Sequence, residues 1–180
     1  MAEQIRRLER KLMYQGAILD IYKDTMQLPN GSTEAWDFIS HRMGAAAVLP
    51  VLPDGRIIMV RQYRNALERE TLEIPAGCRD SLEEGTDVCA ARELEEDTGY
   101  RSDNITFLLS LRTTVAFCDE YVDVYLARDL KPGTRHLDEA ESIDVEYYTV
   151  EELCGMIYGG KLQDAKTVSA ILAYSNMREK

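Results

Sequence analysis

The sequence has few of the features that membrane, secreted or zinc-binding proteins require. No apolar run approaches the roughly 18 residues of a membrane-spanning helix. The basic N-terminal segment also lacks the apolar core of a secretory signal. Histidine occurs only twice, and the four cysteines (Cys78, Cys89, Cys118 and Cys154) include no CxxC pair of the kind that zinc sites use. We therefore expect no structural zinc and a reduced, cytoplasmic protein.

Positive charge is also scarce. The chain has 21 Lys and Arg residues against 32 Asp and Glu residues, a formal net charge of -11 at pH 7. Proteins that bind nucleic acid polymers or anionic membranes need a basic face, so this balance argues against both partners. Residues 83–97 hold seven acids and one base, and residues 138–152 hold seven acids and no base. The negative charge is thus concentrated in two segments. It is compatible with a small anionic substrate if a divalent cation lies between the protein and that substrate.

The order of the expected elements indicates an α/β domain that follows a small β unit. With 180 residues, of which 45% are hydrophobic, the chain has the size and composition of one globular domain with a minor extension. Residues 14–42 indicate β structure around a Pro-Asn-Gly turn, so we assign residues 1–43 to an N-terminal β subdomain and residues 44–180 to the main domain. Strands are predicted at 45–52, 57–62, 71–74, 106–115, 121–127 and 143–148, and helices at 86–98, after Thr149 and after Asp164. Because strands outnumber helices, the helices must cover a sheet, which we expect to be mixed.

The predicted helix 86–98 carries the strongest chemical signal. With about 100° between successive residues of a helix, Glu93, Glu96 and Asp97 share one face. Three carboxylates this close raise one another's pKa unless a cation neutralises them. Hard oxygen ligands favour Mg²⁺ or Mn²⁺. A solvated acidic helix face is the alternative that periodicity alone leaves open.

The residues around this helix resemble the Nudix box, whose pattern is G-x5-E-x7-R-E-U-x-E-E-x-G-U with U apolar. The matching positions are Gly77, Glu84, Arg92, Glu93, Leu94, Glu96, Asp97, Gly99 and Tyr100. The sequence departs from the pattern twice: one extra residue lies between Gly77 and Glu84, and Asp97 replaces the last glutamate. Arg92 could pair with Glu84 and hold the start of the helix in place. The resemblance implies a Nudix α/β/α sandwich with a mixed β-sheet and a small N-terminal β subdomain.

The same resemblance implies a role for the residues of the box. The ligands of Mg²⁺ or Mn²⁺ would be Glu93, Glu96, Asp97 and the backbone carbonyl of Ala76. Arg92 and Glu84 would act as orienting catalytic residues. Metal ions held in this way neutralise a diphosphate and activate a water molecule for attack on phosphorus.

Outside the box, residues 14–175 resemble the ADP-ribose pyrophosphatase branch of the Nudix family. The resemblance is carried by the N-terminal β unit, by Arg61-Gln62-Tyr63-Arg64, by Leu72-Glu73-Ile74-Pro75-Ala76-Gly77 and by residues 160–167. It implies that Arg64 contacts the diphosphate and that Glu73 helps to hold the substrate. It also implies that Trp36 stacks on adenine from the partner subunit of a homodimer with swapped N-terminal subdomains. The candidate substrate-binding residues are Trp36, Asp37, Arg42, Arg61, Arg64 and Glu73.

The base that deprotonates the attacking water is expected in the second acidic segment. Nudix enzymes place this carboxylate in the loop that corresponds to residues 138–142, on a residue matching Glu139 or Glu141. We favour Glu141, because the sequence Glu-x-Ile-x-Val sets its register. A solvated loop is the alternative for either residue.

The predicted function is metal-dependent hydrolysis of ADP-ribose to AMP and ribose 5-phosphate, or of a related nucleoside diphosphate sugar. Two alternatives stay open. One is a Nudix hydrolase for another nucleotide, such as a different nucleoside diphosphate sugar or an oxidised nucleotide. The other is a non-catalytic Nudix domain that senses a nucleotide. Such domains tend to lose box carboxylates, and every acidic position of the box is acidic here.

Overall fold

The computed structural model describes residues 4–137 and 142–178, which belong to two compact units. One unit comprises the N-terminal residues to Gly44 together with Arg112–Tyr121, and the other comprises Ala45–Leu111 and the chain from Val122 onward. Within the described residues, no helix has the length and apolar character needed to span a membrane. All four cysteines are described, and no disulfide joins them.

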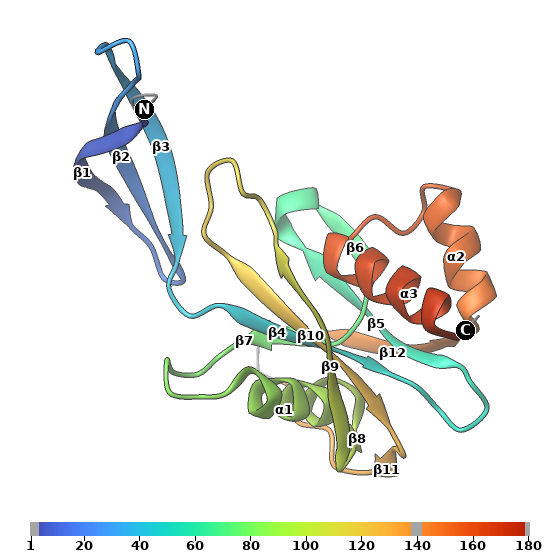
Figure 1. Ribbon diagram of the computed structural model, residues 1–180. Coiled ribbons are helices and arrows are strands. Elements are labelled where there is room, and N and C mark those ends of the chain that lie inside the picture. The colour runs from blue at the N-terminus through green and yellow to red at the C-terminus, as the bar shows by residue number, and fades with distance from the viewer. Residues whose placement is uncertain (1–3, 138–141, 179–180) are drawn as a thin grey trace. The chain divides into compact units, whose positions relative to one another are not determined.

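The first unit contains a three-stranded antiparallel sheet, drawn in blue shades in Figure 1. Its strands are β1 (Arg6–Gln15), β2 (Leu19–Gln27) and β3 (Thr33–His41), in the order β1-β2-β3. Gly31 has a φ of 83° in the turn between β2 and β3, a left-handed conformation that favours glycine. The prediction that β structure starts at residue 14 was wrong, because β1 starts at Arg6 and pairs with β2. Every residue of β1 is exposed, so no alternation of buried and exposed positions marks this strand in the sequence.

The second unit is built around a four-stranded sheet in the order β7-β4-β10-β9. These strands are β4 (Ala45–Pro50), β7 (Ala76–Cys78), β9 (Asn104–Arg112) and β10 (Tyr121–Arg128). β4 runs parallel to β10 and antiparallel to β7, which confirms the predicted mixed sheet. The strand predicted at 106–115 ends earlier, at Arg112, because the chain turns where the Cys118 N–H donates to the Thr114 carbonyl at 3.0 Å.

A second sheet, antiparallel and in the order β12-β5-β6, carries several candidate site residues. Its strands are β5 (Ile57–Arg64), β6 (Arg69–Glu73) and β12 (Ile143–Tyr148), and the short 3-10 helix η1 (Asn65–Leu67) joins β5 to β6. Two short strands, β8 (Tyr100–Arg101) and β11 (Lys131–Pro132), pair separately. Arg61 and Arg64 therefore lie on β5, and Glu73 ends the adjacent β6.

The three helices begin and end at local signals. They are α1 (Thr86–Thr98), α2 (Val150–Tyr158) and α3 (Ala165–Arg178). α1 ends at Gly99, whose φ is 74° and whose N–H donates to the Glu95 carbonyl. At the start of α2, Thr149 and Glu152 form the predicted capping box. At the start of α3, the Thr167 N–H donates to the Asp164 carboxylate at 3.0 Å, which confirms the predicted cap.

Both faces of β4 are buried, and this produces three layers (Figure 1). On one face, Ala46 and Val48 share a core cluster with Leu94 of α1. On the other face, Leu49 shares a second cluster with Ile171 of α3. A strand that meets helices on both faces reads as a continuous apolar run, as β4 does. The predicted α/β/α sandwich is confirmed.

Candidate active site

Glu93, Glu96 and Asp97, here called the α1 carboxylate cluster, differ in burial. Glu93 and Asp97 are 8% and 3% exposed, whereas the side chain of Glu96 is 38% exposed. Gly77 of β7 lies against Glu93, and a Cβ built at Gly77 would overlap the Glu93 carboxyl group. The box glycine therefore provides the space that a buried carboxylate occupies.

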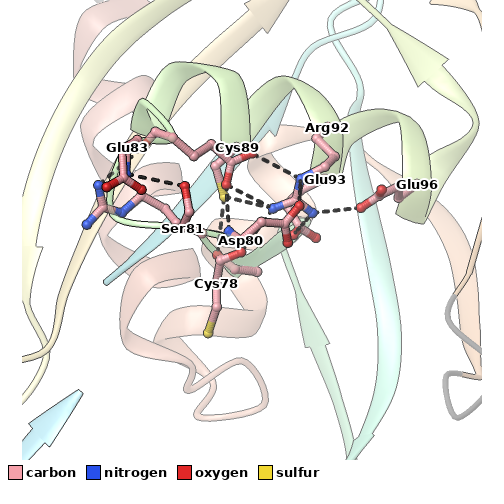
Figure 2. A network of polar contacts seen from close by, with 11 residues as sticks. Cys78, Asp80, Ser81, Glu83, Cys89, Arg92, Glu93 and Glu96 are labelled. Atoms are coloured by element: carbon pink, nitrogen blue, oxygen red, sulfur yellow. Dashed lines mark hydrogen bonds and ion pairs between the residues drawn. The ribbon is translucent and has the colours of Figure 1, made fainter. Parts of the chain in front are cut away.

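Arg92 is the centre of the polar network shown in Figure 2. Its Nη1 donates to Glu93 Oε1 at 2.7 Å and to Glu96 Oε2 at 2.8 Å. Its Nε donates to Glu84 Oε1 at 3.2 Å, and its Nη2 donates to the Cys78 carbonyl at 3.0 Å. The Arg92–Glu84 pair predicted from the sequence is present, and the same guanidinium also pairs with two members of the cluster.

Glu84 connects the loop between β7 and α1 to the helix. Its Oε2 accepts a hydrogen bond from the Asp80 N–H at 2.8 Å, and its carbonyl accepts one from Arg79 Nη1 at 3.1 Å. Burial alone would raise the pKa of Glu84, but the hydrogen bonds from Arg92 and from the Asp80 N–H hold it below its ordinary value. The extra residue relative to the box pattern lies in the segment that leads from Gly77 to Glu84, so the spacing on α1 is unchanged.

Burial dominates the protonation equilibrium of Glu93. Burial raises the pKa of Glu93 to about 7. Arg92 opposes this rise, while the charges of Asp97 and Glu96 add to it. Because the pKa stays high even beside a guanidinium, the environment of Glu93 favours an additional cation.

A hard divalent cation fits the donor chemistry of the cluster. Among residues 4–137 and 142–178, no group of three or more His, Cys, Asp or Glu side chains is arranged to hold a metal ion. Instead, Arg92 bridges Glu93 and Glu96. Carboxylate oxygens are nevertheless the ligands that Mg²⁺ and Mn²⁺ prefer. The fit therefore rests on the donor set and on the raised pKa of Glu93.

Arg64 and Glu73 form an ion pair between β5 and β6, in which Glu73 is buried and Arg64 is partly exposed. Arg64 Nε and Nη2 donate to Glu73 Oε1 and Oε2 at 2.8 and 2.7 Å. Lys166 Nζ also donates to Glu73 Oε2, at 2.5 Å. The hydrogen bond with Glu73 raises the pKa of Arg64, and the charge of Asp97 on α1 adds to this rise. Arg64 is thus within electrostatic reach of the α1 carboxylate cluster.

Two other candidate arginines have ion-pair partners of their own. Arg61 Nε and Nη2 donate to the two carboxylate oxygens of Glu146 at 2.5 and 3.2 Å. Arg42 Nε and Nη2 donate to the carboxylate of Asp20 at 3.0 and 2.6 Å, and Arg42 also donates to carbonyls of the turn between β1 and β2. These contacts give Arg42 a structural role within the first unit.

The remaining candidates divide into exposed residues and residues outside the described range. Trp36 and Asp37 are exposed on β3, and Trp36 Nε1 donates to Glu34 Oε2 at 3.3 Å. Glu139 and Glu141 lie outside the described residues. The choice of base therefore stays a prediction.

Comparison with known proteins identifies the family. The NUDIX domain family matches residues 41–171. The chain belongs to the Nudix family. Among curated relatives, ADP-ribose pyrophosphatase of Bacillus subtilis is 38% identical over 96% of this chain and 92% of its own. Methanol dehydrogenase activator of Bacillus methanolicus is 37% identical over 91% and 89%, and ADP-ribose pyrophosphatase of Mycobacterium tuberculosis is 31% identical over 92% and 81%.

A solved structure shows the same Nudix fold. The crystal structure of an ADP compounds hydrolase superposes with a TM-score of 0.89 and 19% identity, covering 99% of this chain and 96% of that one. Together with the curated relatives, this match confirms the predicted resemblance to Nudix hydrolases, ADP-ribose pyrophosphatases among them.

Sequence reasoning predicted the Asp164 cap but missed that Thr71 and Lys166 bind Glu73 in this Nudix protein. The cap fixes the start of α3 and places Lys166 in its first turn, so it is the signal that could have drawn attention to Lys166.

Proposed function

We propose that this Nudix protein hydrolyses the diphosphate bond of ADP-ribose, with Mg²⁺ or Mn²⁺, to give AMP and ribose 5-phosphate. Water attacks one phosphorus, and the bond from that phosphorus to the bridging oxygen breaks. The observation that carries the proposal is the α1 carboxylate cluster, in which Gly77 leaves room for Glu93 and the pKa of Glu93 stays high beside Arg92. Two relatives at 38% and 31% identity bear the name ADP-ribose pyrophosphatase, which supports the choice of substrate.

Each residue then has a stated role. The metal would be held by Glu93, Glu96, Asp97 and the carbonyl of Ala76. When bound, it neutralises the diphosphate and activates water. Arg92 and Glu84 keep the loop and the helix together around the carboxylates. Glu141, or alternatively Glu139, would accept the proton of the attacking water.

Substrate recognition would use cationic and aromatic groups outside the box. A guanidinium suits phosphate oxygens, since it offers several N–H groups in one plane. The side chain of Arg64 is 41% exposed, and its two hydrogen bonds to Glu73 fix its orientation. Trp36 offers an exposed ring on which adenine could stack.

We further propose a homodimer formed through the N-terminal sheet, with Trp36 acting in the partner's site. Exposed large apolar side chains in the first unit support this assembly, since patches of this kind mark protein interfaces. They include Ile5, Leu8, Leu12, Met13, Tyr14 and Ile18. Sedimentation should show a dimer, and a monomer at assay concentrations would exclude the swapped arrangement.

A hydrolysis screen tests the function. ADP-ribose, other nucleoside diphosphate sugars and oxidised nucleotides are incubated with Mg²⁺, with Mn²⁺ or with EDTA, and nucleoside monophosphate release is measured. We expect the largest kcat/KM with ADP-ribose and no reaction in EDTA. A better substrate elsewhere in the panel would favour another Nudix activity. Binding of ADP-ribose without AMP release would favour a sensor.

Two glutamate variants separate metal binding from general acidity of the helix. Glu96→Gln removes a proposed ligand, and we expect it to reduce kcat by roughly 100-fold or more, since loss of an activating metal removes several kcal/mol of transition-state stabilisation. Glu95→Gln is the matched control, because the Glu95 side chain accepts a hydrogen bond from the Thr134 N–H away from the cluster. Full activity of Glu96→Gln with Mg²⁺ would show that the metal assignment is wrong.

A further inference from the structure

Glu73 has no acceptor position left for a substrate. It is 2% exposed, and each of its two oxygens accepts two hydrogen bonds. Oε1 accepts from Arg64 Nε at 2.8 Å and from Thr71 Oγ1 at 2.6 Å. Oε2 accepts from Arg64 Nη2 at 2.7 Å and from Lys166 Nζ at 2.5 Å. A carboxylate offers about four lone-pair sites, so these donors use its full capacity.

Lys166 is fixed by the start of α3. Its Nζ donates to Asp164 Oδ2 at 3.0 Å as well as to Glu73. Asp164 also accepts from Thr167 Oγ1 at 2.6 Å, and Thr167 Oγ1 accepts from the Ile74 N–H at 3.0 Å. Two routes therefore tie the first turn of α3 to the end of β6, one through Lys166 and one through the buried Thr167.

These contacts leave one edge of the Arg64 guanidinium available. Nε and Nη2 bind Glu73, whereas Nη1 makes no hydrogen bond with any residue that the structure describes. The Arg64 side chain is 41% exposed, so its outer edge reaches solvent. Because Arg64 cannot rotate without breaking two charge-assisted hydrogen bonds, this edge has a defined direction.

We infer that Glu73 and Lys166 are positioning residues, which orient the free edge of Arg64 toward the substrate diphosphate and do not themselves touch the substrate. This inference rests on the proposed function, since it takes the ligand of Arg64 to be a diphosphate. It reassigns Glu73, which the sequence resemblance placed among the groups that hold the substrate. It also gives Lys166 a role that neither the box nor the arginine motif contains.

The first test compares three lysine variants by steady-state kinetics. Lys166→Met removes the ammonium and keeps an unbranched side chain. We expect KM for ADP-ribose to rise roughly tenfold, because a loosened Arg64 loses affinity equivalent to about one charged hydrogen bond. The value of kcat should stay within about twofold of wild type. Lys166→Arg should restore most of the affinity. Lys161→Met, at an exposed lysine between α2 and α3, is the matched control and should match wild type.

A double-mutant cycle separates positioning from direct contact. If Lys166 acts only through Arg64, then Lys166→Met added to Arg64→Ala should raise KM no further than Arg64→Ala alone. Full additivity of the two effects would overturn the inference, as would a Lys166→Met enzyme that melts at lower temperature but keeps the wild-type KM. If Lys166→Met does not fold, Asp164→Asn loosens Lys166 while its amide oxygen can still cap α3. No rise in KM for that variant would likewise count against positioning.

Calorimetric titration with ADP-ribose in EDTA measures the Kd for this ligand in the absence of turnover. The Kd of Lys166→Met should rise by the same factor as KM. A wild-type chain that neither hydrolyses nor binds ADP-ribose would overturn the proposed function and this inference together. Wild-type hydrolysis combined with unchanged KM and Kd in Lys166→Met would overturn this inference alone.

Discussion

Replacing Gly77 by alanine tests the packing on which the α1 carboxylate cluster depends. The new Cβ would overlap all three atoms of the Glu93 carboxyl group, so this side chain must leave its buried position. The move breaks the 2.7 Å bond to Arg92, and a hydrogen bond to a charged group contributes about 1.5–3 kcal/mol. Alanine offsets roughly 0.4–1 kcal/mol of this by restricting the unfolded chain. We expect a net loss of about 1–2 kcal/mol in the free energy of unfolding.

Gly155 provides the matched control for this substitution. It lies inside α2, and a Cβ built there meets no atom within 4 Å. Gly155→Ala should therefore stabilise the protein by roughly 0.5–1 kcal/mol, the ordinary gain at a helix interior.

The assay is urea and thermal unfolding in EDTA, where no metal can mask the loss. For a chain of this size, about 1 kcal/mol corresponds to roughly 2–4 °C in Tm. Gly77→Ala should then melt a few degrees below wild type, and Gly155→Ala slightly above it. If Gly77→Ala were as stable as wild type while Gly155→Ala behaved as expected, Glu93 would not occupy the space beside Gly77, and the reasoning about the cluster would fail.

Three further predictions concern other charged and aromatic groups. Arg92→Met leaves the largely buried Glu84 and Glu93 without their shared counter-charge, so the free energy of unfolding in EDTA should fall by about 3 kcal/mol. An unchanged free energy of unfolding would contradict the role of Arg92. Burial would raise the pKa of Glu73, but Arg64 and Lys166 lower it from 4.5 to about 2. The ionised Glu73 therefore stabilises the folded state above pH 4.5, and this stabilisation is lost toward pH 2. The free energy of unfolding of Glu73→Gln should be about 3 kcal/mol below that of wild type at pH 7, and this difference should shrink between pH 4.5 and pH 2. A constant difference would contradict the lowered pKa. Trp36→Ala should raise KM for ADP-ribose roughly tenfold or more through lost stacking with little change in Tm; an unchanged KM would remove Trp36 from the site.

Local signals allowed much of the second unit to be predicted. The chain turns at Gly99 because a left-handed residue ends α1 there, and Thr149 and Asp164 cap the next two helices. Helical spacing placed Glu93, Glu96 and Asp97 on one face of α1, but the burial of Glu93 and Asp97 was not predicted. Each of these features depends on residues within one or two helical turns of one another, which is the range over which sequence patterns carry information.

Features that depend on distant segments were not predictable. β1 is exposed along its whole length, so its pairing with β2 leaves no periodic trace. Glu73 meets Lys166 across 93 residues of sequence. The sequence also could not decide which arginines face a ligand. Arg42, Arg61 and Arg64 each bind both oxygens of a carboxylate, and only packing determines which edge of a guanidinium is used.

In the α1 carboxylate cluster, an internal arginine is compatible with the metal that we propose. From the sequence, a divalent cation was the simplest way to neutralise carboxylates on one helix face. The structure adds Arg92, which pairs with Glu84 as well as with Glu93 and Glu96. Arg92 is thus shared among three carboxylates. The pKa of Glu93 is still raised to about 7, first by burial and then by its acidic neighbours, despite Arg92. At neutral pH, Glu93 can therefore keep a proton or ionise beside an added cation. A proton neutralises one carboxylate only, whereas a divalent ion of the kind that we propose can be bound by several carboxylates at once.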